Sequence, residues 1–166
     1  MESKQLKNIR IFNKLNDVEL AQVNGMTREK RFHKGEIIMQ EGQAGDTMYL
    51  IVSGDVEVTK TLTMKFGQND FRETEKVMTR FGPDDHEVFG EMALIARENR
   101  SASITAITDC VLLEINREDF LMLVENSPGL GARILMGISE LLVYRLRKVS
   151  QDVIRLTTAL SVALSK

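Results

Sequence analysis

Residues that build metal centres and covalent cross-links are scarce in this sequence. Its 166 residues include one cysteine, Cys110, two histidines, His33 and His86, and no tryptophan. A single cysteine cannot close a disulfide within the chain or hold a four-cysteine iron–sulfur cluster, and two histidines far apart in sequence lack the clustered ligands of a zinc or haem site. We therefore expect no metal and no resident cofactor, and a metal-dependent enzyme is the class that the composition favours least.

An excess of positive charge and a long apolar run are also missing. The formal net charge is −2 and the sequence pI is about 5.8, whereas proteins that bind nucleic-acid backbones usually carry a basic excess. The longest apolar run, Met48–Val52, is far shorter than the roughly 20 residues of a membrane span, and the opening segment MESKQLKNIR contains no apolar core of a signal peptide. The chain is thus predicted to be cytoplasmic, with neither nucleic acid nor a membrane as a direct partner.

The middle of the chain has the pattern of a β domain. Short apolar runs follow one another from Arg31 to Ile115, namely EIIM, MYLIV, VEV, SITAI and VLLEI, and glycines interrupt them at positions 35, 42, 45, 54, 67, 82 and 90. Short strands separated by frequent turns are typical of a double-sheet jelly roll. The polar stretch Lys60–Lys76 is expected to be a long connection between two of these strands, and 43% apolar residues suffice for a core without disulfides.

Helices are predicted on both sides of the β region. The segment NIRIFNKLNDVELAQV has apolar residues at helical spacing, and Asn16 with Glu19 has the spacing of a capping box. Further along, REDFLMLVEN predicts a short helix that ends at NSPG, and a longer helix follows it. We accordingly divide the chain into residues 1–126, the β domain with its helical lead-in, and residues 127–166, the long C-terminal helix.

The last helix carries a heptad pattern. Its apolar residues recur at alternating steps of four and three, and they are Leu142, Leu146, Val149, Val153, Leu156, Leu160 and Ala163. A stripe this narrow favours a two-stranded coiled coil, and therefore a homodimer joined through residues 127–166. The alternative is that the same stripe packs back on the β domain of its own chain.

The segment FGEMALIARENRSASITA, from residue 89 to 106, combines features that suit an anion. Gly90 permits close approach of the backbone to a ligand, and a short helix over MALIAREN would direct free N–H groups toward a negative charge. Arg100 could form a bidentate pair with a phosphate, Ser101 could add a hydroxyl donor, and the Glu91 carboxylate could accept from a sugar hydroxyl. Together these residues predict a phosphorylated sugar as the ligand.

The same charges also allow a purely structural interpretation. Glu91 and Arg100 could pair with each other, or with Arg97 and Glu98, and close a surface loop without any ligand. Taken alone, the segment leaves both interpretations open.

The order and spacing of these residues resemble the phosphate-binding cassette of the cyclic nucleotide-binding domain family. That cassette has the pattern FGE, a leucine three residues on, and an arginine followed by a small residue and alanine, which here fall on residues 89–91, 94 and 100–102. Other turns resemble the family as well: IF-x-x-L from residue 11, KGE from 34, EG-x-x-GD from 41 and Y-x-I-x-SG-x-V from 49. The resemblance covers most of residues 8–150. It implies a mainly β fold with flanking helices, an eight-stranded double-sheet jelly roll followed by a short helix and a long C-terminal dimerisation helix.

The resemblance also implies a ligand, cyclic AMP or cyclic GMP, and a role for each site residue. The residues implied to hold the cyclic phosphate are Arg100, Ser101, Ala102 and Ala93, the alanines through their backbone N–H groups. Those implied to hold the ribose 2′-hydroxyl are Glu91 and Gly90. Those implied to face the base are Met78, Thr79, Val149 and Ser150.

Three departures from the most similar subgroup, the bacterial catabolite activator type, shape the functional expectation. Val149 stands where that subgroup has a base-reading threonine, so the preferred base is left open. The region Val58–Val88 is longer than the usual hairpin, and its segment PDDHEV adds negative charge beside the mouth of the pocket. The chain stops at Lys166 without the helix-turn-helix domain of those activators.

We therefore expect a non-catalytic cyclic nucleotide sensor that relays its signal through the C-terminal helices to another, unidentified protein. If the sequence is a fragment, the missing part could instead be an output domain. The alternative from a different class is a nucleotide-free dimerisation or docking module that retains the fold, in which Arg100 is only structural.

Overall fold

The computed structural model describes residues 3–65 and 71–165, and it begins with a small helical region. Three short elements make up this region: α1 (Ser3–Asn8), the 3-10 helix η1 (Arg10–Phe12) and α2 (Asp17–Gly25). The predicted capping box is confirmed, because the Asn16 side chain accepts from the Glu19 N–H at 3.0 Å and the Glu19 carboxylate accepts from the Asn16 N–H at 2.9 Å. These reciprocal bonds satisfy two N–H groups at the start of α2.

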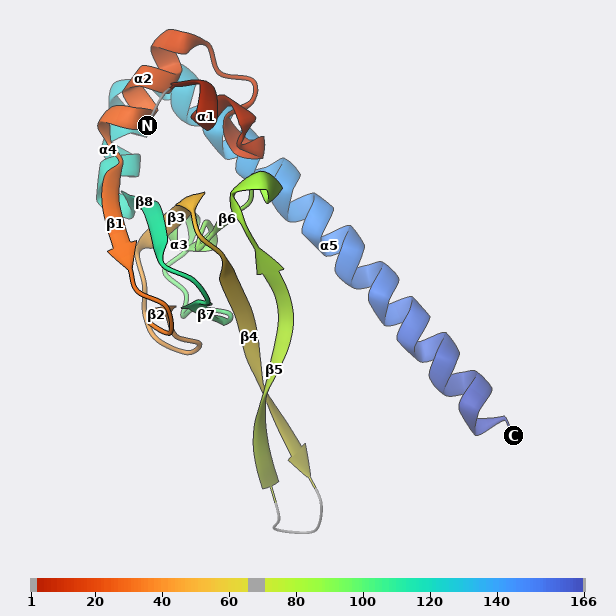
Figure 1. The fold of residues 1–166 in the computed structure, drawn as a ribbon. Helices are drawn as coiled ribbons and strands as arrows, with labels where there is room; N and C mark the ends of the chain where they lie inside the picture. The colour runs from red at the N-terminus through yellow and green to blue at the C-terminus, as the bar shows by residue number, and fades with distance from the viewer. Residues whose placement is uncertain (1–2, 66–70, 166) are drawn as a thin grey trace.

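Eight antiparallel strands form two four-stranded sheets, which confirms the predicted jelly roll (Figure 1). The first sheet has the order β1-β8-β3-β6, and the second has the order β2-β7-β4-β5. Each sheet joins strands that are far apart in the sequence, as in other folds built from two facing sheets. The strands are β1 (Arg28–Phe32), β2 (Ile37–Met39), β3 (Thr47–Ser53), β4 (Val56–Lys65), β5 (Phe71–Phe81), β6 (Val88–Phe89), β7 (Ser103–Ala106) and β8 (Cys110–Asn116).

Alternation along β3 separates two hydrophobic clusters. Met48 and Leu50 belong to the cluster that includes the helices, whereas Tyr49 and Ile51 belong to the cluster formed by both sheets. Successive side chains of a strand point to opposite faces, so the first sheet is covered by helices on one side and by the second sheet on the other. This double burial explains why the strand reads as a continuous apolar run in the sequence.

The stretch expected to be a connection, Lys60–Lys76, is instead largely a strand ladder. β4 and β5 pair from Val56 opposite Phe81 to Lys65 opposite Phe71, with one register shift; residues 66–70 lie outside the described residues. The hairpin projects from the rest of the domain (Figure 1). Its outer part is exposed on both faces, so no apolar alternation marks it as a strand, although threonine suits extended backbone.

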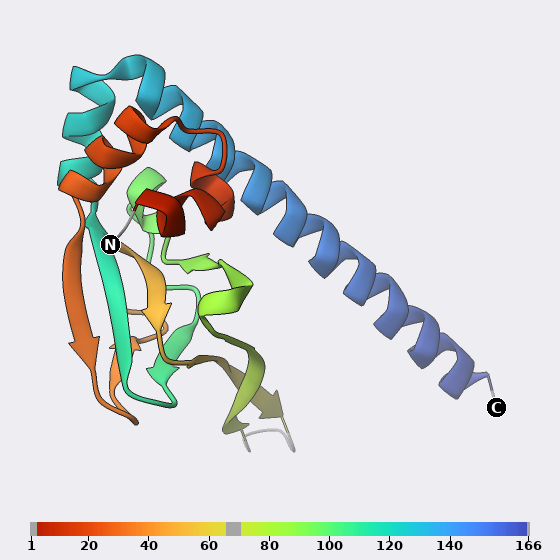
Figure 2. The same cartoon turned by 45° about the horizontal axis from the view of Figure 1, so that its top comes forward.

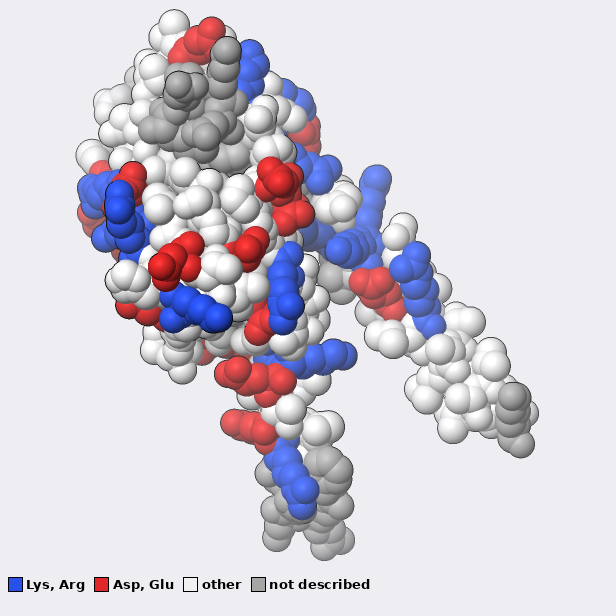
Figure 3. All heavy atoms as spheres, in the orientation of Figure 1, with Lys and Arg blue, Asp and Glu red and all other residues white. Residues whose placement is uncertain are grey.

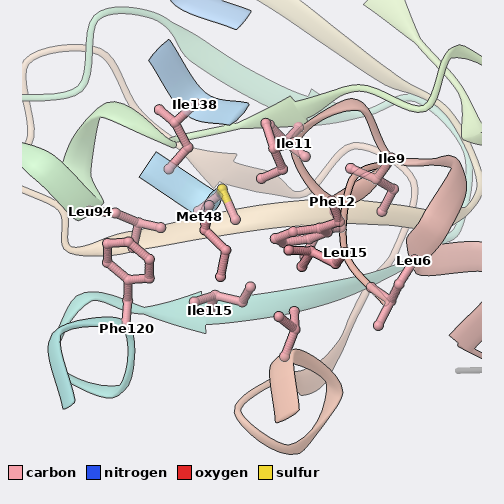
Figure 4. Packing of buried hydrophobic residues seen from close by; sticks show 14 of the residues in the cluster. Leu6, Ile9, Ile11, Phe12, Leu15, Met48, Leu94, Ile115, Phe120 and Ile138 are labelled. Carbon is pink, nitrogen blue, oxygen red and sulfur yellow. The ribbon is translucent and has the colours of Figure 1, made fainter. Parts of the chain in front are cut away.

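Two helices complete the chain, at the positions that the sequence predicts. They are α4 (Arg117–Asn126) and α5 (Pro128–Leu164, 37 residues). The first half of α5 belongs to the main core, where Ile138 shares a cluster with Phe12 of η1 and Met48 of β3 (Figure 4). The division of the chain at residues 126 and 127 stays a prediction, and the core joins this half of α5 to the rest of the domain.

The contact between α5 and η1 depends on a glycine. A Cβ atom at Gly137 would lie 2.5 Å from the carbonyl oxygen of Ile11 and 2.9 Å from its Cα atom. Since a real Cβ does not come this close to backbone atoms, the helix can approach η1 only where it carries no side chain.

The second half of α5 leaves the domain and extends away from it, as both ribbon views show (Figures 1 and 2). Leu142 is partly buried and packs against the core, so the first part of the heptad stripe does contact its own chain. From Leu146 onward the stripe is exposed: Leu146 at 67%, Val149, Val153, Leu156 at 70% and Leu160. This stretch of the helix keeps an apolar face that its own chain does not cover.

Candidate functional site

A cavity of about 120 Å³ lies where β6 leads into the short helix α3 (Met92–Ile95). Its apolar wall comes largely from the second sheet, through Met39, Val58, Phe81 and Ile104. Among the described residues that line it are six of those predicted from the sequence: Gly90, Glu91, Ala93, Arg100, Ser101 and Ala102. The fold therefore brings the expected phosphate and ribose residues together in one place.

Arg100 lies in this cavity with only uncharged hydrogen-bond partners. Its Nη1 donates to the Thr47 carbonyl oxygen at 2.7 Å, and its Nη2 donates to Thr47 Oγ1 at 2.8 Å. Burial lowers the pKa of Arg100 below its ordinary value, while Tyr49 and Asp46 act in the opposite direction. A half-buried guanidinium that is held by neutral groups keeps its positive charge available for an anion.

Two glycines make room for the Arg100 side chain. Gly90 has φ +77°, and a Cβ atom there would lie 2.6 Å from the Thr47 carbonyl oxygen and 2.9 Å from Arg100 Nη1. A Cβ atom at Gly45 would overlap the Arg100 guanidinium itself. The EG-x-x-GD and FGE motifs thus supply the space that the cation occupies, and Gly90 also supplies the left-handed backbone that few other residues tolerate.

Glu91 is buried, with 3% of its surface exposed, and it pairs with an arginine of α5. Arg145 Nη1 donates to Glu91 Oε1 at 2.9 Å, and Arg145 Nη2 donates to Glu87 Oε2 and to the Val88 carbonyl oxygen, both at 2.7 Å. Burial by itself lowers the pKa of Arg145, but the two carboxylates outweigh it and raise the pKa above its ordinary value. Of the two structural pairings considered for Glu91 and Arg100, the structure shows neither.

Arg145 is a site residue that the sequence analysis missed. It continues the buried stripe of α5 formed by Ile134, Ile138 and Leu141, at steps of four, three and four residues. An arginine on the buried face of a helix needs an acidic or carbonyl partner from another element. That position in the pattern was the available signal, and the heptad stripe beside it drew attention to the apolar residues instead.

The helix expected over MALIAREN is shorter than predicted. α3 contains only Met92–Ile95, and the following residues leave helical geometry at Ala96. The Ala93 N–H donates to the Gly90 carbonyl oxygen at 3.1 Å, so this group has a partner within the turn. The Leu94 side chain lies in the main core, which fixes α3 against the first sheet.

The residues predicted to face the base lie elsewhere. Met78 and Thr79 are on β5, and Val149 and Ser150 are on the projecting part of α5. None of the four is among the described residues that line the cavity. Their contact with a base stays a prediction, and for Val149 and Ser150 it depends on where the exposed helix lies in an assembly.

Two further classes of site were searched for. In residues 3–65 and 71–165, no group of three or more His, Cys, Asp and Glu side chains is arranged to hold a metal ion. Of the helices in these same ranges, none has both the length and the hydropathy that crossing a membrane requires.

The fold and the cavity define the chain as a jelly-roll domain that binds a small ligand, with a cation and a buried acceptor in one pocket. Residues 29–127 match the family described as "Cyclic nucleotide-binding domain". The chain belongs to the cyclic nucleotide-binding domain family, and the recognition made on the cassette motif is confirmed.

Several known proteins are similar to this chain. A cyclic nucleotide-gated potassium channel of Mesorhizobium japonicum is 32% identical over 121 residues, which are 73% of this chain and 29% of the channel. The cyclic AMP receptor protein of Thermus thermophilus is 32% identical over 125 residues, 75% of this chain and 51% of that protein. The crystal structure of the Thermus thermophilus catabolite activator protein has a TM-score of 0.74 at 29% identity, covering 89% of this chain and 63% of the other. The chain thus spans about half or less of the curated relatives' length.

Proposed function

We propose that this chain is a non-catalytic sensor of a cyclic nucleotide, cyclic AMP or cyclic GMP. The observation that carries the proposal is the placement of Arg100 and Glu91 in one cavity, with a cation for the cyclic phosphate and a buried acceptor for the ribose 2′-hydroxyl. Membership of the family and the similarity to a cyclic AMP receptor protein support it. The remaining carboxylate oxygen of Glu91 has no hydrogen-bond partner among the described residues, and it is the acceptor that we assign to the sugar.

The size of the cavity supports a conformational response. Its volume of about 120 Å³ is well below the roughly 300–1,000 Å³ that is usual for ligand pockets, so a nucleotide must displace part of the lining as it enters. Glu91 is bonded to Arg145 on α5, so a ligand that engages Glu91 acts on this helix directly. We propose that binding shifts the position of α5 between two states, and that a downstream protein responds to this shift.

A second copy of the chain is the partner that we propose for the exposed stripe of α5. A stripe repeating every three and four residues fits the seam of a two-stranded coiled coil, and the residues from Leu146 to Leu160 remain uncovered by their own chain. In such a dimer the seam would bring Val149 and Ser150 of one copy toward the site of the other.

Calorimetric titration with cyclic AMP and cyclic GMP tests the proposal, with Arg100→Ala beside the unchanged chain. We expect binding that Arg100→Ala weakens by about 30-fold to several thousand-fold, because the variant strands a buried phosphate charge. Arg100→Lys should recover only part of the loss, since an ammonium cannot form the bidentate pair. The unchanged chain also shows which base is preferred where Val149 replaces a hydroxyl.

The docking-module alternative predicts a different result. A folded chain that gives no heat with either nucleotide at high concentration, and whose melting temperature neither ligand raises, would overturn the sensor proposal. Arg100 would then be a structural residue that holds Thr47.

A further inference from the structure

The ion pair between Glu91 and Arg145 includes a second carboxylate, that of Glu87. Arg145 lies between the two, at 2.9 Å from Glu91 and 2.7 Å from Glu87. All three side chains are largely withdrawn from water, with exposed fractions of 31% for Arg145, 20% for Glu87 and 4% for Glu91. One positive charge is shared by two negative charges, so the cluster carries a net charge of −1.

The other charges near the cavity do not offset this surplus. Arg100 is the second cation, and two more carboxylates accompany it: Asp46 acts on Arg100 electrostatically, and Glu98 lines the cavity. Four acidic groups therefore surround two cations at a site that is proposed to receive an anionic phosphate. Glu87 differs from Glu91 because it does not line the cavity, and so has no direct role in holding the ligand.

We propose that Glu87 is an affinity-setting residue: its charge lowers the affinity of the pocket for the cyclic phosphate by occupying the cation that otherwise neutralises Glu91. This inference rests on the proposed cyclic nucleotide binding. Without the Glu87 charge, Arg145 and Glu91 form a neutral pair, and Arg100 alone sets the potential that the phosphate meets. With it, the pocket binds less tightly and so responds at a higher ligand concentration.

The size of the effect follows from Coulomb's law. For two unit charges on the order of 10 Å apart, at an effective dielectric constant of about 40, the interaction changes a dissociation constant roughly fourfold. Partly exposed charges are screened by salt, with a Debye length of about 10 Å at 0.1 M and about 3 Å at 1 M. The effect of Glu87 should therefore be present at low salt and largely absent at high salt.

Glu87→Gln tests this inference, because glutamine keeps a carbonyl oxygen that can accept from Arg145 and removes only the charge. We expect the variant to bind cyclic AMP or cyclic GMP about fourfold more tightly than the unchanged chain at 0.1 M salt, and equally tightly at 1 M salt. A purely structural role would not produce this salt dependence. The matched control is Glu73→Gln on the exposed hairpin, which removes the same charge far from the cavity and should leave the affinity unchanged.

The outcomes separate the two proposals. If the unchanged chain binds neither nucleotide, the proposed function fails, whatever Glu87 does. If the chain binds but Glu87→Gln binds equally or more weakly at low salt, the affinity-setting role is wrong and Glu87 only orders Arg145. Melting curves show whether the variant is folded, and Glu87→Ser, which also removes the charge, should tighten binding in the same direction if glutamine disturbs the fold.

Discussion

Arg100 depends on the absence of a side chain at Gly45. The guanidinium fills the space where a Cβ atom would stand, and Thr47 on the same loop supplies both of its acceptors. Gly45 does not have a positive φ angle, so its backbone would tolerate alanine. The only atoms in the way are the far end of the flexible arginine side chain, which can shift without unfolding the domain.

We predict that Gly45→Ala binds cyclic nucleotide at least about tenfold more weakly, a loss of about 1.4 kcal/mol, while its melting temperature stays close to that of the unchanged chain. The added methyl group displaces the guanidinium from the position where it meets the phosphate. Calorimetry and thermal unfolding measure the two quantities. The matched control is Gly25→Ala in α2, where a Cβ atom would meet no atom within 4 Å; equal affinities for the two variants would contradict the prediction.

The cassette residues could be predicted from the sequence because they are close together in it. The spacing from Glu91 to Arg100 lies within one segment, and the cavity indeed contains both. The partners of these residues could not be found in this way. Thr47 and Arg145 come from 53 and 54 residues away, and only the fold brings them into contact.

α5 has two parts with different surroundings. Its first half is buried through Ile134, Ile138 and Leu141, and the ion pairs of Arg145 mark the end of this contact. Beyond Arg155 the helix carries no charged residue as far as Leu164, and its tip is correspondingly free of red and blue in Figure 3. An exposed helix segment with an apolar stripe and few charges is stable in water only with a partner.

We predict that Leu146→Asp and Val153→Asp each convert a dimer into a monomer, because a carboxylate in the seam must be desolvated without a cation opposite it. Sedimentation equilibrium measures the association. Gln151→Asp is the matched control, since it adds the same charge on the opposite face of the helix and should leave the dimer intact. Dimers that persist in both seam variants would show that α5 does not join the chains.

The β elements were predictable to different degrees. The buried runs such as MYLIV and VLLEI are strands as predicted, because each has a core on both faces and hence a strong apolar signal. The outer hairpin was taken for a connection, because its side chains are exposed on both faces. The strand ladder there depends on backbone pairing between β4 and β5, which leaves little trace in the composition.

The two hydrophobic clusters make the whole domain one cooperative unit. They share the strands of the first sheet, and the main cluster joins the N-terminal helices, β3, β8 and the first half of α5. No part of this core can be lost without exposing the apolar surface of its neighbours.

We predict a single thermal transition for the chain, which cyclic nucleotide shifts upward. At a free ligand concentration of 100 times Kd, the free energy of unfolding rises by about 2.7 kcal/mol, which corresponds to about 5–10 °C for a chain of this size. Differential scanning calorimetry at fixed protein concentration measures both features. Two resolved transitions, or a shift confined to one of them, would contradict the prediction of one unit.

α5 also has a mechanical consequence. It is held in the domain up to Arg145 and is free from there to Leu164, a length of about 28 Å at the rise of an α-helix. For a stiff rod of that length, a rotation of about 10° at the held end displaces the free end by about 5 Å. The free segment is therefore a lever arm, and the amplitude of its stroke is set by the number of helical turns that extend beyond the last ion pair.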